Sequence, residues 1–206
     1  MNSWRKFLTF VSLILSGVTG SQAATSGGTS PGLLGTDLTR ARSRSDYFQF
    51  FNLELTGPAQ PLANGGQILS FKPSGSDFHQ LVTVYVETDS TGLISALRVI
   101  IARSFIDDPQ NGVFARDLIK SSLLTGVSEG DAANLNELAT EILYRNLKRT
   151  LLSRSEPTLS ATPSAAYLVV EGTNSEWETT LTSSTIKLTN QTQENRPALV
   201  IEIQVK

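Results

Sequence analysis

The sequence of 206 residues contains no cysteine. This absence excludes disulfides, thiolate metal sites and cysteine nucleophiles, together with lipid attachment through a cysteine at the end of a leader peptide. A chain without such links must be stabilised by its packed core alone. Its length is sufficient for one domain with a core of ordinary size.

Histidine is almost as scarce, because His79 is the only one. A single imidazole cannot form a multi-histidine zinc site, and any Ser-His-Asp triad would have to use this residue. Residues 126–130, GVSEG, match the G-x-S-x-G pattern of hydrolases. That pattern requires a preceding strand and a later histidine, whereas here a helix is predicted before it and His79 lies upstream. We therefore predict no catalytic residue, no cofactor and no metal site.

The chain also lacks any marked charge, since its 17 basic and 19 acidic residues give a formal net charge of −2. The first 23 residues include Arg5 and Lys6 and no acid, so the remainder is slightly more acidic still. A mildly acidic protein has no long-range attraction for nucleic acid or for anionic lipid. Neither is predicted as a partner.

The first 23 residues have the three-part pattern of a secretory signal peptide. Arg5 and Lys6 give a positive start, residues 7–18 are apolar, and residues 21–23 are small enough for a cleavage site. The apolar run is shorter than the ~20 residues of a membrane span, so no transmembrane anchor is predicted. We expect a periplasmic or secreted protein. Its predicted parts are a signal peptide (1–23), a flexible Gly/Ser/Thr-rich linker (24–35) and a single α+β domain (36–206).

Alternating and helical patterns in the remaining sequence predict the fold of this domain. Residues 81–86 and 93–102 are rich in β-branched side chains and flank the turn at 89–92, which indicates a central hairpin. Two consecutive helices follow, the first ending at Gly126 and the second capped by Asp131. Further strands are predicted at residues 47–55, 67–71, 167–171, 176–188 (with a break near 183) and 198–205. The predicted fold is α+β, a mostly antiparallel sheet of about 6–7 strands with two consecutive helices packed on one face.

Two features of the sequence are candidates for binding. Trp177, between Glu176 and Glu178, can stack on a sugar or anchor a protein partner if it is exposed, although tryptophan is more often buried. The second candidate is a row of three arginines spaced by two. In an extended segment they would share one face and could receive an anionic group, and the alternative is a solubilising stripe. These arginines are Arg40, Arg42 and Arg44.

These observations predict an exported, non-catalytic binding or interaction module of the cell envelope or extracellular space. Its partner would be a protein or an envelope polymer. Two alternatives remain open: an exported hydrolase that uses a pair of carboxylates, and a carrier of a small ligand held between the sheet and the helices. The sequence leaves the oligomeric state open, although the last strand, LVIEIQVK, would favour dimerisation if it formed an exposed edge.

Overall fold

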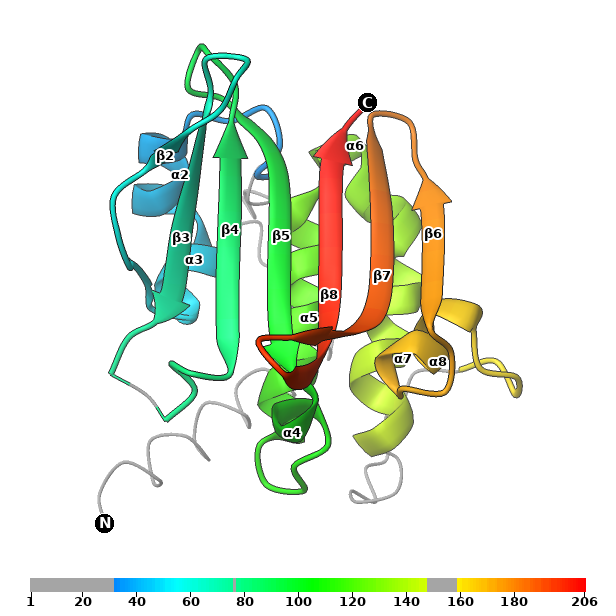
Figure 1. Ribbon diagram of the computed structural model, residues 1–206. Coiled ribbons are helices and arrows are strands. Elements are labelled where there is room, and N and C mark those ends of the chain that lie inside the picture. Colours follow the sequence, from blue (N-terminus) through cyan, green and yellow to red (C-terminus); the bar gives the residue numbers. More distant parts are fainter. Residues whose placement is uncertain (1–31, 76, 148–158) are drawn as a thin grey trace, which may run out of the picture.

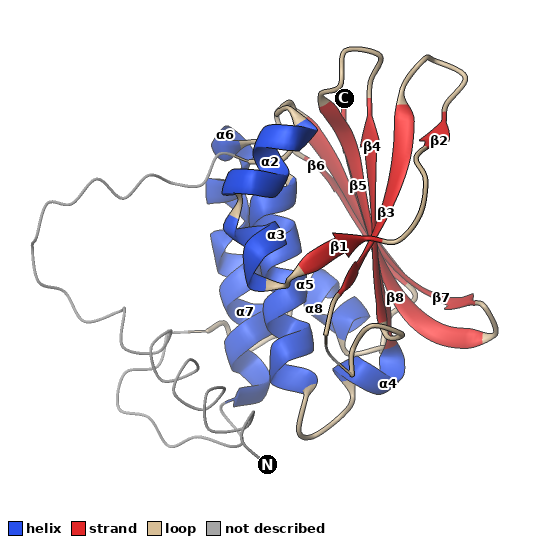
Figure 2. Ribbon diagram, turned by 90° about the vertical axis from the view of Figure 1, so that its left-hand side faces the viewer, coloured by secondary structure: helices blue, strands red, loops and turns tan. Residues whose placement is uncertain are grey.

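The computed structural model describes residues 32–75, 77–147 and 159–206, which form two layers. One layer is an antiparallel sheet of eight strands in the order β1-β3-β4-β5-β8-β7-β6, with the short β2 paired to β3 (Figure 1). Helices cover one face of the sheet, and no helix of the described residues lies over the other face (Figure 2). The predicted α+β class and the mostly antiparallel sheet with helices on one face are confirmed.

The elements occur in the chain in the order helices, strands, helices, strands. The strands are β1 (Leu53–Leu55), β2 (Gln60–Pro61), β3 (Gln67–Pro73), β4 (Val82–Thr88), β5 (Ile94–Ala102), β6 (Glu176–Thr180), β7 (Ser184–Gln193) and β8 (Arg196–Val205). The helices are α2 (Leu38–Arg44), α3 (Asp46–Phe50), α4 (Arg103–Ile106), α5 (Gly112–Gly126), α6 (Glu129–Ala132), the 3-10 turn η1 (Ala133–Leu135), α7 (Asn136–Leu147) and α8 (Ala165–Val170).

The hairpin of β4 and β5 lies in the middle of the sheet, as the sequence predicts. Val82, Val84 and Val86 point towards the helices and are almost fully buried, because side chains of a strand point alternately to the two faces. The opposite face carries the positions between them, such as Tyr85 and Glu87. β5 pairs on its other side with β8, so the final strand lies inside the sheet. Because β8 is not an edge strand, it cannot support dimerisation in the way that an exposed final strand would.

The helix layer is joined to the sheet by one continuous cluster of buried hydrophobic side chains. On α5, Leu118, Ile119 and Leu123 are fully buried, as the helical spacing of apolar residues requires. Gly126 ends α5 at a point where the helix touches the sheet, since a Cβ atom there would lie 2.5 Å from Ile203 Cδ1. The glycine therefore permits a close approach of the two layers.

Two segments predicted as strands contain helices. The segment 47–55 contains most of α3 and then the short β1, and most of the segment 167–171 belongs to α8. The Ser45 side chain caps α3 by accepting a hydrogen bond from the Tyr47 N–H, and Ser164 caps α8 in the same way. The caps satisfy amides that would otherwise be unpaired. Burial of both helices against the core outweighs the strand propensity of their aromatic and β-branched residues.

The domain begins earlier than predicted. Residues 32–35, expected as the end of a flexible linker, pack against the junction of α5 and α6. Leu33 is only 1% exposed and donates its N–H to Thr125 O at 2.6 Å. Gly32 leaves no room for a side chain, because a Cβ atom there would overlap Val127 O. The rest of the expected linker and the expected signal peptide lie outside the described residues.

A helix that spans a membrane needs about 20 mostly apolar residues, and the helices in the described ranges do not meet this requirement. None of them combines the necessary length with a sufficiently apolar composition.

Candidate functional site

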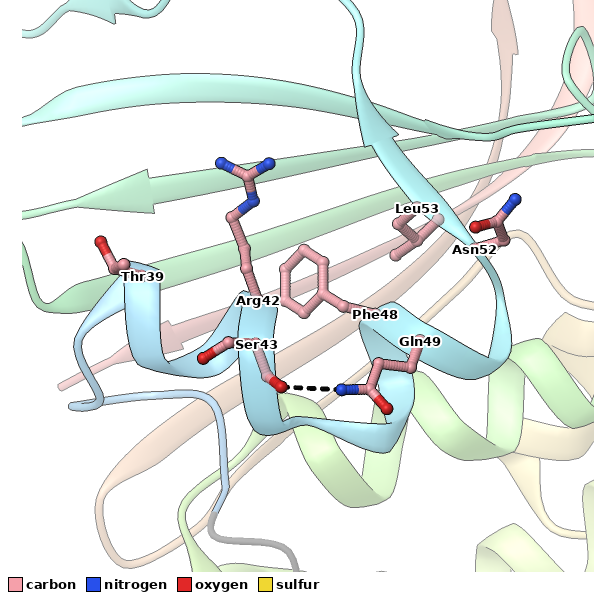
Figure 3. A pocket seen from close by; sticks show the side chains of 7 residues that line it. All are labelled: Thr39, Arg42, Ser43, Phe48, Gln49, Asn52 and Leu53. Carbon is pink, nitrogen blue, oxygen red and sulfur yellow. Dashed lines mark hydrogen bonds between the residues drawn. The ribbon is translucent and has the colours of Figure 1, made fainter.

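A shallow recess of about 410 Å³ opens on the surface where α2 and α3 meet the start of β1 (Figure 3). We call it the α2–α3 recess. One of its residues, Arg42, belongs to the arginine row singled out in the sequence. The lining residues are Thr39, Arg42, Ser43, Phe48, Gln49, Asn52 and Leu53.

The recess exists because two short helices meet at a turn centred on Ser45. Asp37 caps α2 by accepting a hydrogen bond from the Arg40 N–H at 2.9 Å, and Ser45 caps α3. The backbone of Ser45 is extended (φ −80°, ψ 125°), so the chain changes direction between the helices. Phe48 then attaches α3 to the sheet, since its ring meets the Phe71 ring edge-on at a centroid distance of 5.2 Å.

The three arginines do not share one face, because their segment is helical and not extended. Residues two apart on an α-helix point in very different directions, whereas in a strand they point the same way. Of Arg40, Arg42 and Arg44, only Arg42 lines the recess. Its guanidinium lies 5.5 Å from the centre of the Phe71 ring, which is a cation–π contact. Arg42 forms no ion pair with any carboxylate of the described residues.

Some of the other polar groups in the recess are already committed to the fold. Gln49 Nε2 donates a hydrogen bond to Ser43 O at 2.7 Å (Figure 3), and Asn52 Nδ2 donates to Ser74 Oγ at 2.8 Å. Asn52 has a φ of 46°, a left-handed conformation that asparagine tolerates better than most residues. This conformation turns the chain from α3 into β1. The guanidinium of Arg42 is therefore the group with the most donors left for a ligand.

The polar side chains of the recess can form hydrogen bonds with an anion. None of its seven residues is a carboxylate or a histidine, the groups most often used for general acid–base catalysis. The planar guanidinium of Arg42 can donate two parallel hydrogen bonds to a carboxylate or a phosphate. The side chain of Thr39 adds a hydroxyl at the rim (Figure 3). The arrangement can hold an anionic group that a larger partner presents at the surface.

Trp177, the other residue predicted to bind, lies on the helix-covered face of β6. Its side chain is partly buried against the core, and its cross-strand neighbour is the fully buried Leu188. Glu176 and Glu178 point to the opposite face. Trp177 is therefore closer to a core residue than to an exposed ring that could stack on a sugar. A binding role for Trp177 stays a prediction.

The buried carboxylate of Asp131 belongs to the framework of the fold and does not line the recess. Asp131 was expected only to cap a helix, but it holds the turn between β6 and β7 against α6. It accepts hydrogen bonds from the N–H groups of Thr182 and Ser183 and from the hydroxyls of Ser183 and Ser184. Burial acts to raise the pKa of Asp131, but these hydrogen bonds outweigh it and lower the pKa to about 2.

The single histidine does not line the depression on the open face of the sheet where three strand acids, Glu87, Glu178 and Glu202, come together with Arg98 and Lys187. His79 Nδ1 lies 2.9 Å from Pro73 O. Glu202 lies 3.4 Å from Arg98 Nε in this depression of about 270 Å³, where acids and bases are interleaved. In the ranges that the structure describes, no three histidine or acidic side chains lie close enough together to hold a metal ion.

Of the residues that line the recess, only Arg42 is predicted from the sequence. Phe48, Gln49 and Asn52 fell within a predicted strand, so their position beside Arg42 could not be inferred. One signal was present in the sequence. Ser45 followed by Asp46 is typical of a helix start, with a capping hydroxyl and an acid in the first turn.

Comparisons of the chain with protein-family models, with curated proteins and with solved structures found no match. The functional assignment therefore depends on the geometry of the α2–α3 recess and on the sequence.

Proposed function

We propose that the protein is a non-catalytic binding module outside the cytoplasm, and that the α2–α3 recess recognises an anionic group of a protein or an envelope polymer. The observation that carries this proposal is the state of Arg42. It is an exposed cation without an ion pair among the described residues, in a recess without carboxylate or histidine. The signal-peptide pattern of residues 1–23 supports a location in the cell envelope or the extracellular space.

The setting of Arg42 favours the binding of an oxyanion for two physical reasons. The contact with the Phe71 ring restricts the guanidinium, so less side-chain entropy is lost when a ligand binds. In addition, an incoming anion does not have to displace a carboxylate that is already bound. A hydrogen bond to a charged group contributes about 1.5–3 kcal/mol, which corresponds to roughly a 10- to 150-fold change in affinity.

The test is binding of the full chain to two anionic probes, polyglutamate and polyphosphate, and to an isolated cell-envelope fraction. The Arg42→Ala variant is expected to bind at least tenfold more weakly than the wild type. Arg44→Ala is the matched control, because it removes the same charge from the same helix outside the recess. It is expected to change binding less than twofold. Raising the ionic strength should weaken wild-type binding, since an exposed ion pair is screened by salt.

Several results would contradict the proposal. Equal losses in the two variants would mean that binding follows net charge and not the recess. Binding that Arg42→Ala leaves unchanged would place the site elsewhere. If the wild type bound neither probe and no envelope fraction, the recess would have no role in recognising anions.

A further inference from the structure

The outer edge of β6 is a second surface, at the opposite end of the sheet from the α2–α3 recess (Figure 1). β6 is the last strand of the sheet and pairs only with β7. No other strand of the described residues lies along its outer side. A free edge of this kind presents backbone donors and acceptors to which another strand can bind.

Hydrogen bonds to the β7 segment just before and just after β6 show which of its backbone groups face outwards. Leu181 donates its N–H to Ser184 O at 2.8 Å, and Asn190 donates to Ser175 O at 2.7 Å. Bonded and non-bonded pairs alternate along an antiparallel ladder. Residues 177 and 179 therefore bond to β7. The outward-facing N–H and C=O groups belong to Glu176, Glu178 and Thr180.

The opposite edge of the sheet is covered by short strands, whereas no strand of the described residues covers the outer side of β6. At that opposite edge, β3 is covered by the short strands β1 and β2, and Pro61 lies within β2. Between them, Thr56 donates both its N–H and its hydroxyl to Ser70 O. Proline, bulges and charged side chains, lysine above all, are the usual devices that stop an edge from pairing. β6, with the sequence EWETT, has no proline, lysine or bulge. Its charged residues are glutamates, which repel an acidic strand and attract a basic one.

The side chains of β6 indicate what kind of strand the edge accepts. Glu176 and Glu178 are exposed on the open face, while Trp177 lies half-buried on the helix side. Glu176 lies 3.5 Å from Lys187 Nζ, whereas Glu178 has no ion pair in the described part of the chain. A second copy paired antiparallel about Glu178 would place that carboxylate opposite itself, which is unfavourable.

We propose that the outer edge of β6 binds an extended segment of another protein by strand addition. The segment carries lysine or arginine at the positions that face Glu176 and Glu178. Apolar residues at the alternate positions cover Trp177 on the helix side. Main-chain hydrogen bonds to Glu176, Glu178 and Thr180 supply the affinity, and the alternating side chains supply the specificity. This surface is independent of the recess.

The test uses the full chain with Trp4→Phe, so that Trp177 is its only tryptophan. The probe is a peptide as long as β6 in which lysine and valine alternate, and the control peptide has glutamate in place of lysine. The lysine peptide is expected to slow amide hydrogen exchange at Glu176, Glu178 and Thr180 at least tenfold and to change the Trp177 fluorescence. The glutamate peptide is expected to bind at least tenfold more weakly.

Three variants separate the contributions of backbone and charge. Thr180→Pro removes an outward N–H without changing charge, and it should weaken binding of the lysine peptide at least tenfold while the circular dichroism stays the same. Glu178→Lys should reverse the preference between the two peptides. Glu87→Lys makes the same charge change on β4, on the same face but away from the edge, and should change binding less than twofold.

The proposal is overturned if the lysine peptide leaves the three amides unprotected, if Thr180→Pro binds as well as the parent chain, or if Glu87→Lys acts like Glu178→Lys. It is also overturned if these amides become protected in the protein alone as its concentration rises. That result would assign the edge to a second copy of the chain.

Discussion

The two ends of the sheet are joined to the helix layer by different kinds of contact. At the end formed by β1, β3 and β4 the contact is aromatic, and we call it the aromatic end. There Tyr47 meets Phe48 and Phe51 edge-on, and Phe48 meets Phe71 in the same way. The ring centroids lie 5.2 to 5.9 Å apart, a distance at which such pairs add to the free energy of burial.

At the end formed by β6, β7 and β8, buried polar groups make many of the contacts, and we call it the polar end. Asp131 on α6 binds the turn between β6 and β7. Asn190 on β7 donates hydrogen bonds to Val169 O and Asn174 O, at the end of α8 and in the loop that follows it. These contacts fix loops whose sequence has few apolar residues to bury.

The difference teaches that the two ends respond to different conditions. Aromatic packing depends on shape and buried area, so it is indifferent to pH. A buried carboxylate stabilises the fold only while it is ionised and hydrogen-bonded, so the polar end depends on pH. Substitutions at each end should therefore differ in size and in their response to acid.

The largest effect is expected from Phe71→Ala at the aromatic end. Phe71 is fully buried, so truncation removes its buried area and leaves a cavity, which costs about 3–5 kcal/mol of unfolding free energy. Urea unfolding at pH 7 and at pH 4 measures this loss, which should be the same at both. Phe71→Leu is the control and should lose much less. A loss below about 1 kcal/mol for Phe71→Ala would show that aromatic packing at this end contributes little to the free energy of unfolding.

A smaller effect is expected from Asp131→Asn at the polar end. The asparagine fills the same space, but its amide nitrogen is a donor. It would face N–H and O–H groups that donate hydrogen bonds to the carboxylate in the wild type. Leaving such buried donors unsatisfied costs about 1–3 kcal/mol at pH 7. Urea unfolding measures this, with Asp117→Asn as a control on a partly buried acid that lies 3.4 Å from Lys120 Nζ. Equal stability of Asp131→Asn and the wild type would show that the charge is not needed.

The dependence of stability on pH distinguishes the loss of the Asp131 charge from a purely steric effect of the substitution. Because the pKa of Asp131 is lowered from 3.8 to about 2 in the folded state, the unfolded chain takes up its proton first as the pH falls. The stability that Asp131 contributes is therefore complete above about pH 5 and is lost as the pH falls through about 2. The difference between the wild type and Asp131→Asn should shrink from pH 6 to pH 3. A constant difference would contradict the assignment.

The sequence was a good guide to the elements with one clear period. The alternation of β4 and the amphipathic stripe of α5 predicted strand and helix correctly, because burial on one face leaves a pattern that can be read locally. It was a poor guide to α3 and α8. Their aromatic and β-branched residues favour strands. The two segments are helical because serine side chains cap them and because they pack against the core. The α2–α3 recess depends on that packing, so only Arg42 could be named from the sequence.

The smallest effect is expected from Tyr47→Phe, which removes a polar contact from the aromatic end. The Tyr47 hydroxyl lies 2.9 Å from Ser122 Oγ, and Ser122 donates its own proton to Leu118 O. Tyr47 is therefore the donor to Ser122, and burial raises its pKa, so the hydroxyl stays neutral. Its removal should cost about 1 kcal/mol, equally at pH 7 and pH 4, because Ser122 keeps its bond to Leu118. A double-mutant cycle with Ser122→Ala measures the pair, and a loss that depended on pH would erase the contrast between the aromatic and polar ends.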